Sequence, residues 1–329
     1  MKKLLVSILV VLCLFATAIP LTACSSGDGA YMLSYELKDD GTYDCQGIRA
    51  KVAFSNADMS VLIIPSEYEG VAVTSVSASN YDFSENIKKI VLSEGITKIG
   101  GGDVEESESG HSVGEHAFSN YSALEEIELP STLKEITSKI PSNVKVTIAE
   151  GNNTFEYKDN CIVEKETNRI VAGFDGAKVP DYATEICNFA FQNCQMSSLK
   201  IPTSVTKIGA FAFDGATIDQ EINLEFKGNT LTAVQMFAFK GLEVNSVDFA
   251  SATTEFSPNA FSECSFVTLI NTVTPKVKFN EKLSFDGSAL KWLYYSIGSK
   301  DIPDDIYLEV ESDKANYRKF DYTKFAENN

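Results

Sequence analysis

A cysteine near the N-terminus lies in a context where covalent lipid attachment is expected. Four residues form the motif: Leu21, Thr22, Ala23 and Cys24. They resemble a lipobox, in which small residues precede a cysteine that is diacylglycerated before the leader is cleaved. The preceding lysines and apolar run (residues 2–18) are typical of a secretory signal, shorter than the about 20 residues of a membrane-spanning helix. The motif predicts lipidation of Cys24; the alternative is an ordinary signal peptide in which Cys24 has no such role.

Only two histidines occur in the chain, His111 and His116, and both lie near an acidic run that is rich in glycine and serine. Imidazole and carboxylate groups bind divalent metal ions, so this run could hold one. The carboxylates concerned are Glu105, Glu106, Glu108 and Glu115. They lack the spacing of a calcium loop, and a run of this composition is normally a solvated loop. The sequence therefore predicts no metal site and no cofactor.

None of the cysteines after Cys24 has the setting of a catalytic nucleophile. They are Cys45, Cys161, Cys187, Cys194 and Cys264. Their odd number and irregular spacing argue against a disulfide framework, and no pair has the C-x-x-C spacing of a metal site. No histidine is placed to act as their base, and neither G-x-S-x-G nor a complete phosphate-binding loop occurs. We expect buried thiols and no enzymatic activity.

The net charge of -18 restricts the partners of the chain. Binding to nucleic acid or anionic headgroups requires clusters of lysine and arginine, and the sequence has none. A strongly negative surface repels copies of itself and stays solvated, so we expect a monomer.

The structural elements that would hold a binding site occur repeatedly along the chain. The dipeptide Ala-Phe begins at residues 117, 190, 212, 238 and 260, and the last four copies are 22 to 26 residues apart. A second column, L-x-x-I-x-I and usually a proline, begins at Met59, Ile87, Leu124 and Met196, with weaker copies at Val244 and Leu290. Its last residues alternate as in a strand, and proline ends the strand because it has no N–H to donate. One copy cannot bury its own apolar row, so stacked copies should form a parallel ladder with a continuous core.

These motifs resemble the BspA-like class of bacterial leucine-rich repeats, in which L-x-x-I-x-I-P is followed by V-T-x-I-G-x-x-A-F-x-x-C. The segments VTKIGAFAF at 205–213 and AFQNC at 190–194 match this pattern closely, and the resemblance covers about residues 31 to 329. It implies a repeat solenoid: a leucine-rich-repeat-like parallel β-sheet with short helical or irregular turns, a β-hairpin insert and terminal caps. After about residue 265 the copies depart from the pattern.

The resemblance and the interruptions of the period divide the chain. We expect a signal peptide at 1–23, a tether at 24–30, a capping hairpin at 31–58, the solenoid at 59–305 and a C-terminal cap at 306–329. Within the solenoid, an acidic loop at 101–113 and a hairpin insert at 154–174 interrupt the period. The acidic loop has too few apolar residues to offset the entropy of ordering it, so we expect it to be dispensable for stability.

The outward positions of stacked strands form one regular exposed face, where solenoid proteins usually bind their partners. The candidate residues on this face are Lys88, Lys89, Glu125, Glu126, Glu128, Ser198, Lys200, Glu221, Trp292 and Tyr294. They place an anionic row beside a cationic one, together with the only tryptophan of the chain. Exposed aromatic side chains are typical interface anchors. The alternative for Trp292 is that it packs beneath the C-terminal cap.

The resemblance implies adhesion or recognition, since BspA-like proteins are commonly adhesins. We therefore expect a protein of the bacterial cell surface, lipid-anchored to the outer face of the cell membrane, that binds an extracellular protein or a glycan. The residues themselves indicate only a scaffold and its location. The alternative is a non-catalytic structural stalk or a subunit of an envelope complex, including one that binds glycans; a hydrolase is disfavoured because no catalytic set is present.

Overall fold

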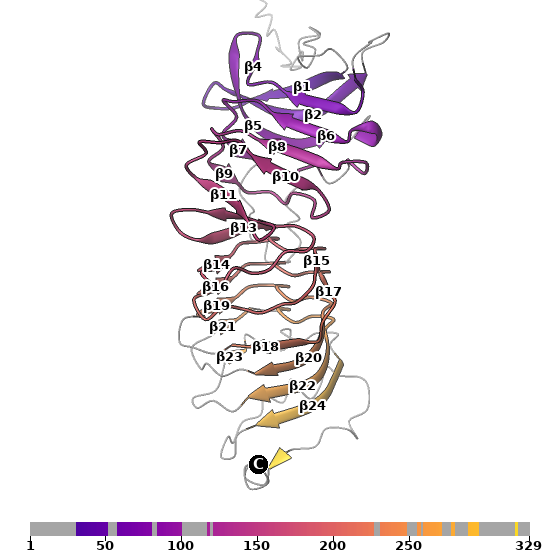
Figure 1. Ribbon diagram of the computed structural model, residues 1–329, viewed down its shortest axis with the longest axis vertical. Helices are drawn as coiled ribbons and strands as arrows, with labels where there is room; N and C mark the ends of the chain where they lie inside the picture. The colour runs from indigo at the N-terminus through magenta and orange to yellow at the C-terminus, as the bar shows by residue number, and fades with distance from the viewer. Residues whose placement is uncertain are drawn as a thin grey trace, which may run out of the picture.

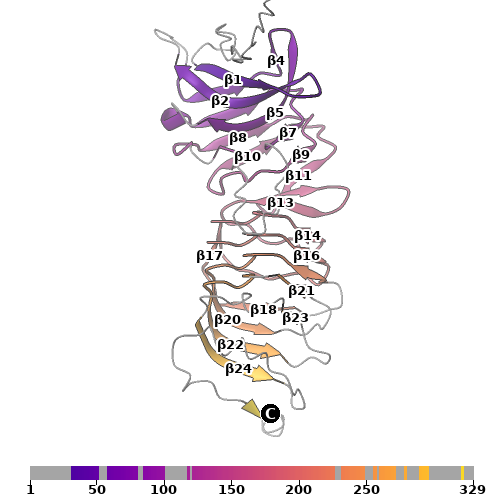
Figure 2. The same ribbon diagram turned by 180° about the vertical axis from the view of Figure 1, so that it is seen from behind.

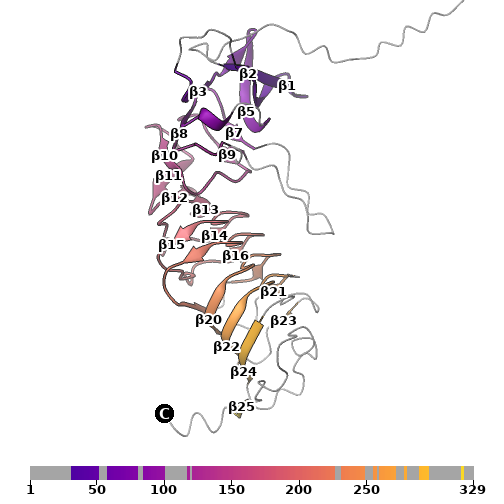
Figure 3. The same ribbon diagram turned by 90° about the vertical axis from the view of Figure 1, so that its right-hand side faces the viewer.

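The protein is a column of stacked coils. The computed structural model describes residues 31–51, 58–80, 84–100, 117–118, 121–226, 231–248, 255–257, 259–271, 278–279, 289–295 and 320–321. The coils follow the chain along the long axis, from the first strands at one end to the last at the other (Figures 1 and 2), and the column is gently bent in profile (Figure 3). Within the described residues the only helical segment is the 3₁₀ turn η1 (Ser84–Asn86). The predicted solenoid of parallel strands is confirmed.

Two sheets form the N-terminal half. The first, which we call the cap sheet, has the order β1-β2-β5-β7-β9, with β4 paired to β5. Its strands are β1 (Tyr31–Leu37), β2 (Tyr43–Lys51), β4 (Glu67–Tyr68), β5 (Val71–Asn80), β7 (Lys98–Ile99) and β9 (Glu135–Ile136). The second is parallel throughout, in the order β10-β8-β6-β3. Its strands are β3 (Val61–Ile64), β6 (Lys89–Leu92), β8 (Glu126–Leu129) and β10 (Lys145–Ile148). The segment predicted as a capping hairpin thus holds the antiparallel pair β1–β2.

Three sheets form the C-terminal half. The largest runs β11-β12-β13-β14-β16-β19-β21-β23. Its strands are β11 (Phe155–Lys158), β12 (Cys161–Glu164), β13 (Arg169–Gly173), β14 (Glu185–Ile186), β16 (Lys207–Ile208), β19 (Ala233–Val234), β21 (Glu255–Phe256) and β23 (Lys278–Phe279). A small sheet pairs β15 (Gln195–Met196) with β17 (Thr217–Ile218). The last sheet joins β18 (Ile222–Glu225), β20 (Glu243–Asp248), β22 (Ser265–Asn271), β24 (Ala289–Tyr295) and β25 (Phe320–Asp321).

A column of phenylalanines runs through the C-terminal half. Phe191, Phe213, Phe239 and Phe261 are all fully buried. Successive rings stack nearly parallel, with centroids 5.2, 5.4 and 5.1 Å apart. A spacing of about one coil along the chain puts each ring at the same position in its coil, so the prediction of one buried column is confirmed.

The turn before each of these rings has an unusual backbone. Phe189, Phe211 and Phe237 have φ angles of 60°, 56° and 54°, a left-handed conformation that is costly for a bulky side chain. Their rings form a second stack, with centroids 5.3 and 5.0 Å apart. Stacking on a neighbouring coil thus accompanies this costly backbone conformation at each of the three residues.

The hairpin insert divides the interior into two cores. The N-terminal core extends over residues 31–174 and the C-terminal core over residues 161–264. Along β12, Cys161 and Val163 belong to the C-terminal core, whereas Ile162 between them belongs to the N-terminal core. In β13, Ile170 and Ala172 divide in the same way. The insert is therefore a β-sheet partition with one core on each face.

One predicted strand is absent. The pattern Met196-x-x-Leu199-x-Ile201 predicts a strand through residue 201, but only Gln195–Met196 is a strand, and residues 197–201 have no regular structure. Leu199 and Ile201 are buried as the pattern requires. The ladder forms earlier in the coil because β15 pairs with β17, so the apolar pattern was right and the strand assignment was wrong.

Candidate binding surface

Several predicted sites lie outside the described residues. They are the lipobox with Cys24, the tether, the acidic loop at 101–113 with His111, and His116. The C-terminal cap at 306–329 is described only at β25, which pairs with β24. Lipidation of Cys24 therefore stays a prediction.

The outward positions of β6, β8 and β10 bring five of the candidate residues together. β8 lies between β6 and β10, and Lys89, Glu126 and Lys145 share one register row. Lys88 Nζ lies 2.8 Å from Glu125 Oε1, and Lys145 Nζ lies 3.4 Å from Glu126 Oε1. Lys89 forms ion pairs with both Glu126 and Glu128.

The anionic row is thus paired with lysines on both of its sides. Glu128 and Glu125 raise the pKa values of Lys89 and Lys88 through these hydrogen bonds. Exposed pairs of this kind contribute about 0–1 kcal/mol each and weaken as salt rises. The predicted neighbouring rows of opposite charge exist, but they are satisfied within the sheet, so a partner gains little by pairing with them.

The next three candidates, Ser198, Lys200 and Glu221, lie in the chain between β10 of the N-terminal sheet and β18 of the last sheet. Ser198 and Lys200 belong to the irregular segment 197–201; Ser198 is half-buried and Lys200 is exposed. Lys200 Nζ lies 3.9 Å from Asp181 Oδ1, and both side chains are almost fully exposed. Glu221 is exposed and immediately precedes β18. These residues do not continue the face of the N-terminal sheet as a strand.

A second face forms in the C-terminal half. Asn223, Ser246, Thr268 and Trp292 share one register row across β18, β20, β22 and β24. Asn223 is exposed and Ser246 is half-exposed. The Asn223 Oδ1 atom accepts hydrogen bonds from Asn245 Nδ2 (2.9 Å) and Ser246 Oγ (2.6 Å). Tyr294 lies two residues further along β24, in the row of Glu225 and Asp248. The backbone register therefore places Trp292 in a polar, uncharged row.

The cysteines have the properties of core residues. Four of the five are buried and Cys187 is half-exposed, and all five are free thiols. Burial raises the pKa of Cys45, Cys194 and Cys264 to about 12 and also raises the pKa of Cys161. Burial raises the pKa of Cys187 to about 11, although Arg169 beside it acts in the opposite direction. Thiols with such pKa values stay protonated at neutral pH, and a protonated thiol is a poor nucleophile.

Other site types find no support in the described part of the chain. Within it, no three His, Cys, Asp or Glu side chains are grouped so that they could hold a metal ion. The described residues also include no helix long and apolar enough to span a membrane.

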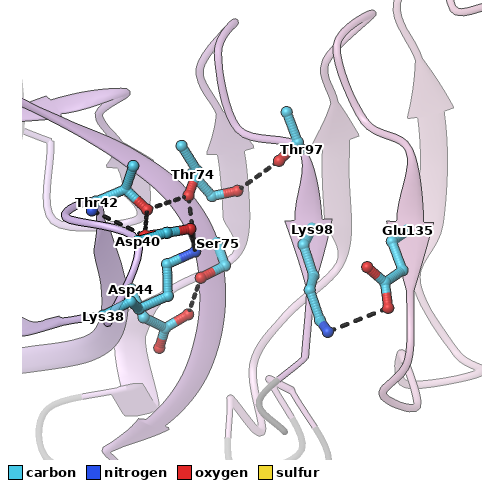
Figure 4. Close-up of polar contacts among 9 residues, drawn as sticks. All are labelled: Lys38, Asp40, Thr42, Asp44, Thr74, Ser75, Thr97, Lys98 and Glu135. Atoms are coloured by element: carbon cyan, nitrogen blue, oxygen red, sulfur yellow. Dashed lines mark hydrogen bonds and ion pairs between the residues drawn. The ribbon is translucent and has the colours of Figure 1, made fainter. Parts of the chain in front are cut away.

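A polar cluster in the cap sheet was missed by the sequence analysis. Asp44, Ser75, Lys98 and Glu135 share one register row across β2, β5, β7 and β9. Figure 4 shows Ser75 Oγ donating to Asp44 Oδ1 at 2.5 Å and Lys98 Nζ contacting Glu135 Oε1 at 3.1 Å. Asp44 is only 6% exposed, although it is an acid. The alternation of Asp44 and Gln46 around Cys45 was a signal of a polar face, but the sequence does not indicate which residues of β5 meet it.

Comparison with known proteins identifies related sequences and folds. The model of the BspA type leucine rich repeat region matches six copies, over residues 102–169 and 184–311. Among solved structures, the chain is similar to the pneumococcal vaccine antigen PcpA, with 17% identity and a TM-score of 0.36 over 83% of this chain and 87% of that chain. It is also similar to a leucine-rich repeat protein from Bacteroides ovatus (19% identity, TM-score 0.42, 80% and 70% covered). A third is a leucine rich cell surface protein from Faecalibacterium prausnitzii (15%, 0.40, 89% and 98%). A comparison with curated proteins finds no match.

Proposed function

Because the chain belongs to the BspA type leucine-rich repeat family, we propose that it is a non-catalytic binding protein of the bacterial cell surface. In this proposal lipid on Cys24 anchors it to the outer face of the cell membrane. The solenoid then adheres to or recognises an extracellular protein or glycan through an outer sheet face. The family and the lipobox support the location, and the stacked parallel strands support binding by a rigid face.

We choose the face of the C-terminal sheet because of one row of residues on it: Asn223, Ser246, Thr268 and Trp292. Parallel strands lie about 4.8 Å apart, so side chains in one row hold a fixed spacing. The N-terminal face consists largely of ion pairs that a partner would have to desolvate or leave intact, whereas this row has no charge to remove from water. The row also includes the only tryptophan of the chain.

The face is tested by binding of the purified chain to immobilised matrix proteins, mucin and polysaccharides. We expect Asn223→Lys to weaken binding to a captured partner by about 10-fold or more, because a new charge enters the uncharged row. The matched control is Thr147→Lys, an exposed position of β10 on the N-terminal sheet. If Thr147→Lys abolishes binding and Asn223→Lys leaves it unchanged, the choice of face is wrong.

The anchor is tested separately with a fatty-acid probe in growing cells. Cys24→Ser should abolish labelling and leave the chain released or unprocessed, since lipid attachment requires the thiol. Equal labelling of the wild-type and mutant chains would refute lipidation at Cys24.

The ion-paired face of β6, β8 and β10 favours a second function, that of a structural stalk. A stalk needs a solvated surface and no recognition site. Retention of surface display by the Asn223→Lys variant, with no captured partner for either form, would favour the stalk over the adhesin.

A further inference from the structure

The cap sheet bears a cleft on the face opposite the core. Its volume is about 560 Å³, and its walls come from β1, β2, β5, β7 and the turn after β1. Sites for small molecules usually have volumes of about 300–1,000 Å³. The strands that bear it, β1, β2, β5 and β7, lie towards the opposite end of the column from β24 (Figure 1), so the cleft is separate from the proposed binding face.

A β-bulge builds the floor of this cleft. Tyr43 pairs with Val73 and Asp44 pairs with Ser75, so Thr74 is an extra residue in β5. A bulge of this kind re-aims the side chains that follow it. Ser75 consequently joins the row of Asp44, and Val76 joins buried Cys45 in the core row.

The floor offers hydrogen-bond acceptors. Asp44 accepts hydrogen bonds from Ser75 Oγ (2.5 Å), Ser77 Oγ (2.7 Å) and Gln46 Nε2 (2.8 Å). A hydroxyl has one proton and two acceptor sites, so both serines, which line the cleft, give their protons to Asp44 and retain lone pairs that can accept. Glu36, which accepts from Gln46 Nε2 at 2.9 Å, adds a further carboxylate to the wall. A ligand must therefore donate several hydrogen bonds to this floor.

The rim offers donors and an apolar surface. Lys38 Nζ donates to Thr74 Oγ1 at 2.9 Å, and Lys98 Nζ contacts Glu135 at 3.1 Å (Figure 4). An ammonium group has three N–H donors, so Lys98 can also donate to a ligand. Leu37 lines the same cleft and is 62% exposed, the largest fraction among the big apolar side chains that the structure describes.

We propose that this cleft binds one sugar residue, as a free hexose or as the end of a glycan chain. Each sugar hydroxyl both donates and accepts, which suits the acceptor floor and the lysine rim, and the C–H face of the ring suits Leu37. An ammonium ligand would pair with Glu36, Asp39 and Asp44, but it offers no acceptor to the N–H groups of Lys38 and Lys98, whose charges are already paired with Asp40 and Glu135. An anion would meet Asp44 and Glu36, and an apolar ligand would leave buried polar groups unpaired.

The test is saturation-transfer NMR of the purified chain with the methyl glycosides of glucose, galactose, mannose and N-acetylglucosamine. At least one should bind with a Kd of about 0.1–10 mM. Asp44→Asn should weaken that binding by about 10-fold or more, because a hydrogen bond to a charged group is lost and the serine protons are reoriented. Leu37→Ser, which removes only the exposed rim, should weaken it by about 3-fold.

Tyr157→Ser is the matched control, since Tyr157 is the other exposed large apolar residue among those described and lies in the distant hairpin insert. It should bind like the wild type. The proposal is overturned if none of the four glycosides gives a signal at about 50 mM, if n-butylamine binds in their place, or if Leu37→Ser and a folded Asp44→Asn both bind unchanged. Tighter binding of a trisaccharide, again dependent on Asp44, would identify the end of a glycan as the ligand; equal affinity would identify the free sugar.

Discussion

The two halves of the solenoid use the same coil but join successive coils differently. In the N-terminal half, ion pairs link the outer sides of neighbouring strands over a core made mainly of Ile, Leu and Val. The C-terminal half also has ion pairs between coils, such as Lys207 with Glu185, but there stacked phenylalanine rings link the coils through the core as well. An aromatic pair contributes about 0.5–1.5 kcal/mol beyond its buried area, whereas an exposed ion pair contributes about 0–1 kcal/mol. The repeat pattern therefore specifies the coil but not the interaction that holds coils together.

Phe213→Ala should be the most damaging change to the C-terminal half. Phe213 stacks on both Phe191 and Phe239, so its loss leaves a cavity in the middle of the column. We expect the free energy of unfolding to fall by about 3–5 kcal/mol. Urea denaturation followed by the fluorescence of Trp292 would measure it. The control, Phe213→Leu, refills most of the cavity without a ring and should cost clearly less; equal losses for the two variants would contradict the cavity as the main cause.

A matched pair of substitutions tests whether the two cores are separate. Ile162→Ala and Ile170→Ala remove the same atoms from fully buried side chains on opposite faces of the partition. Each should cost about 2–5 kcal/mol. Hydrogen exchange should increase mainly over residues 31–148 for Ile162→Ala and mainly over residues 183–248 for Ile170→Ala. Identical exchange profiles would mean that the two halves unfold as a single unit.

Lys139 joins the two halves and should make stability depend on pH. It donates to the carbonyl oxygen of Gln192 at 2.5 Å, and burial lowers its pKa to about 8 from 10.5. The protonated form is thus penalised in the folded state, and the penalty disappears as pH rises from about 8 to 10.5. Lys139→Met should therefore raise stability by about 1–3 kcal/mol near pH 7, with the gain shrinking towards pH 10.5.

The effect of Lys139 has to be measured as the difference in stability between wild type and Lys139→Met, because the buried thiols change stability with pH in the opposite direction. Burial raises their pKa values, so they stabilise the fold below pH 9 and lose that contribution as pH rises further. The wild type alone should therefore lose stability above about pH 9. A gain from Lys139→Met that does not change with pH would show that the lysine is not penalised by burial.

The smallest effect should come from the ion pairs of the N-terminal sheet. Lys88→Met and Glu125→Gln should each leave the free energy of unfolding almost unchanged, because both side chains are more than half exposed. Thermal melts at low and high salt would measure this, and the difference from wild type should vanish at high salt. A loss comparable to that of Phe213→Ala would contradict the contrast between the halves.

Much of the fold could be predicted because it depends on local pattern. The spacing of Phe191, Phe213, Phe239 and Phe261 was sufficient to predict a buried column, since residues about one coil apart take the same position in a stack. The burial of Leu199 and Ile201 followed from the same reasoning. Their strand did not, because ladder hydrogen bonds depend on the register of the neighbouring coil.

The surface was less predictable than the core. Glu125, Glu126 and Glu128 were expected to form an anionic row, and they do, but the sequence does not show that Lys88, Lys89 and Lys145 neutralise it. The Asp44 cluster depends on the bulge at Thr74, a single extra residue whose pairing is set by the strands on either side. The assignment of Trp292 and Tyr294 to a binding face stays a prediction.

The partition formed by β12 and β13 has a consequence for how such a chain can change length. Each core is closed at this sheet, so neither depends on the number of coils stacked beyond it. Duplication or loss of one coil of about 22 residues on the C-terminal side would leave the N-terminal core and its cleft unaltered. Descendants of one gene could therefore differ in the length of the column while keeping the same structure at its N-terminal end.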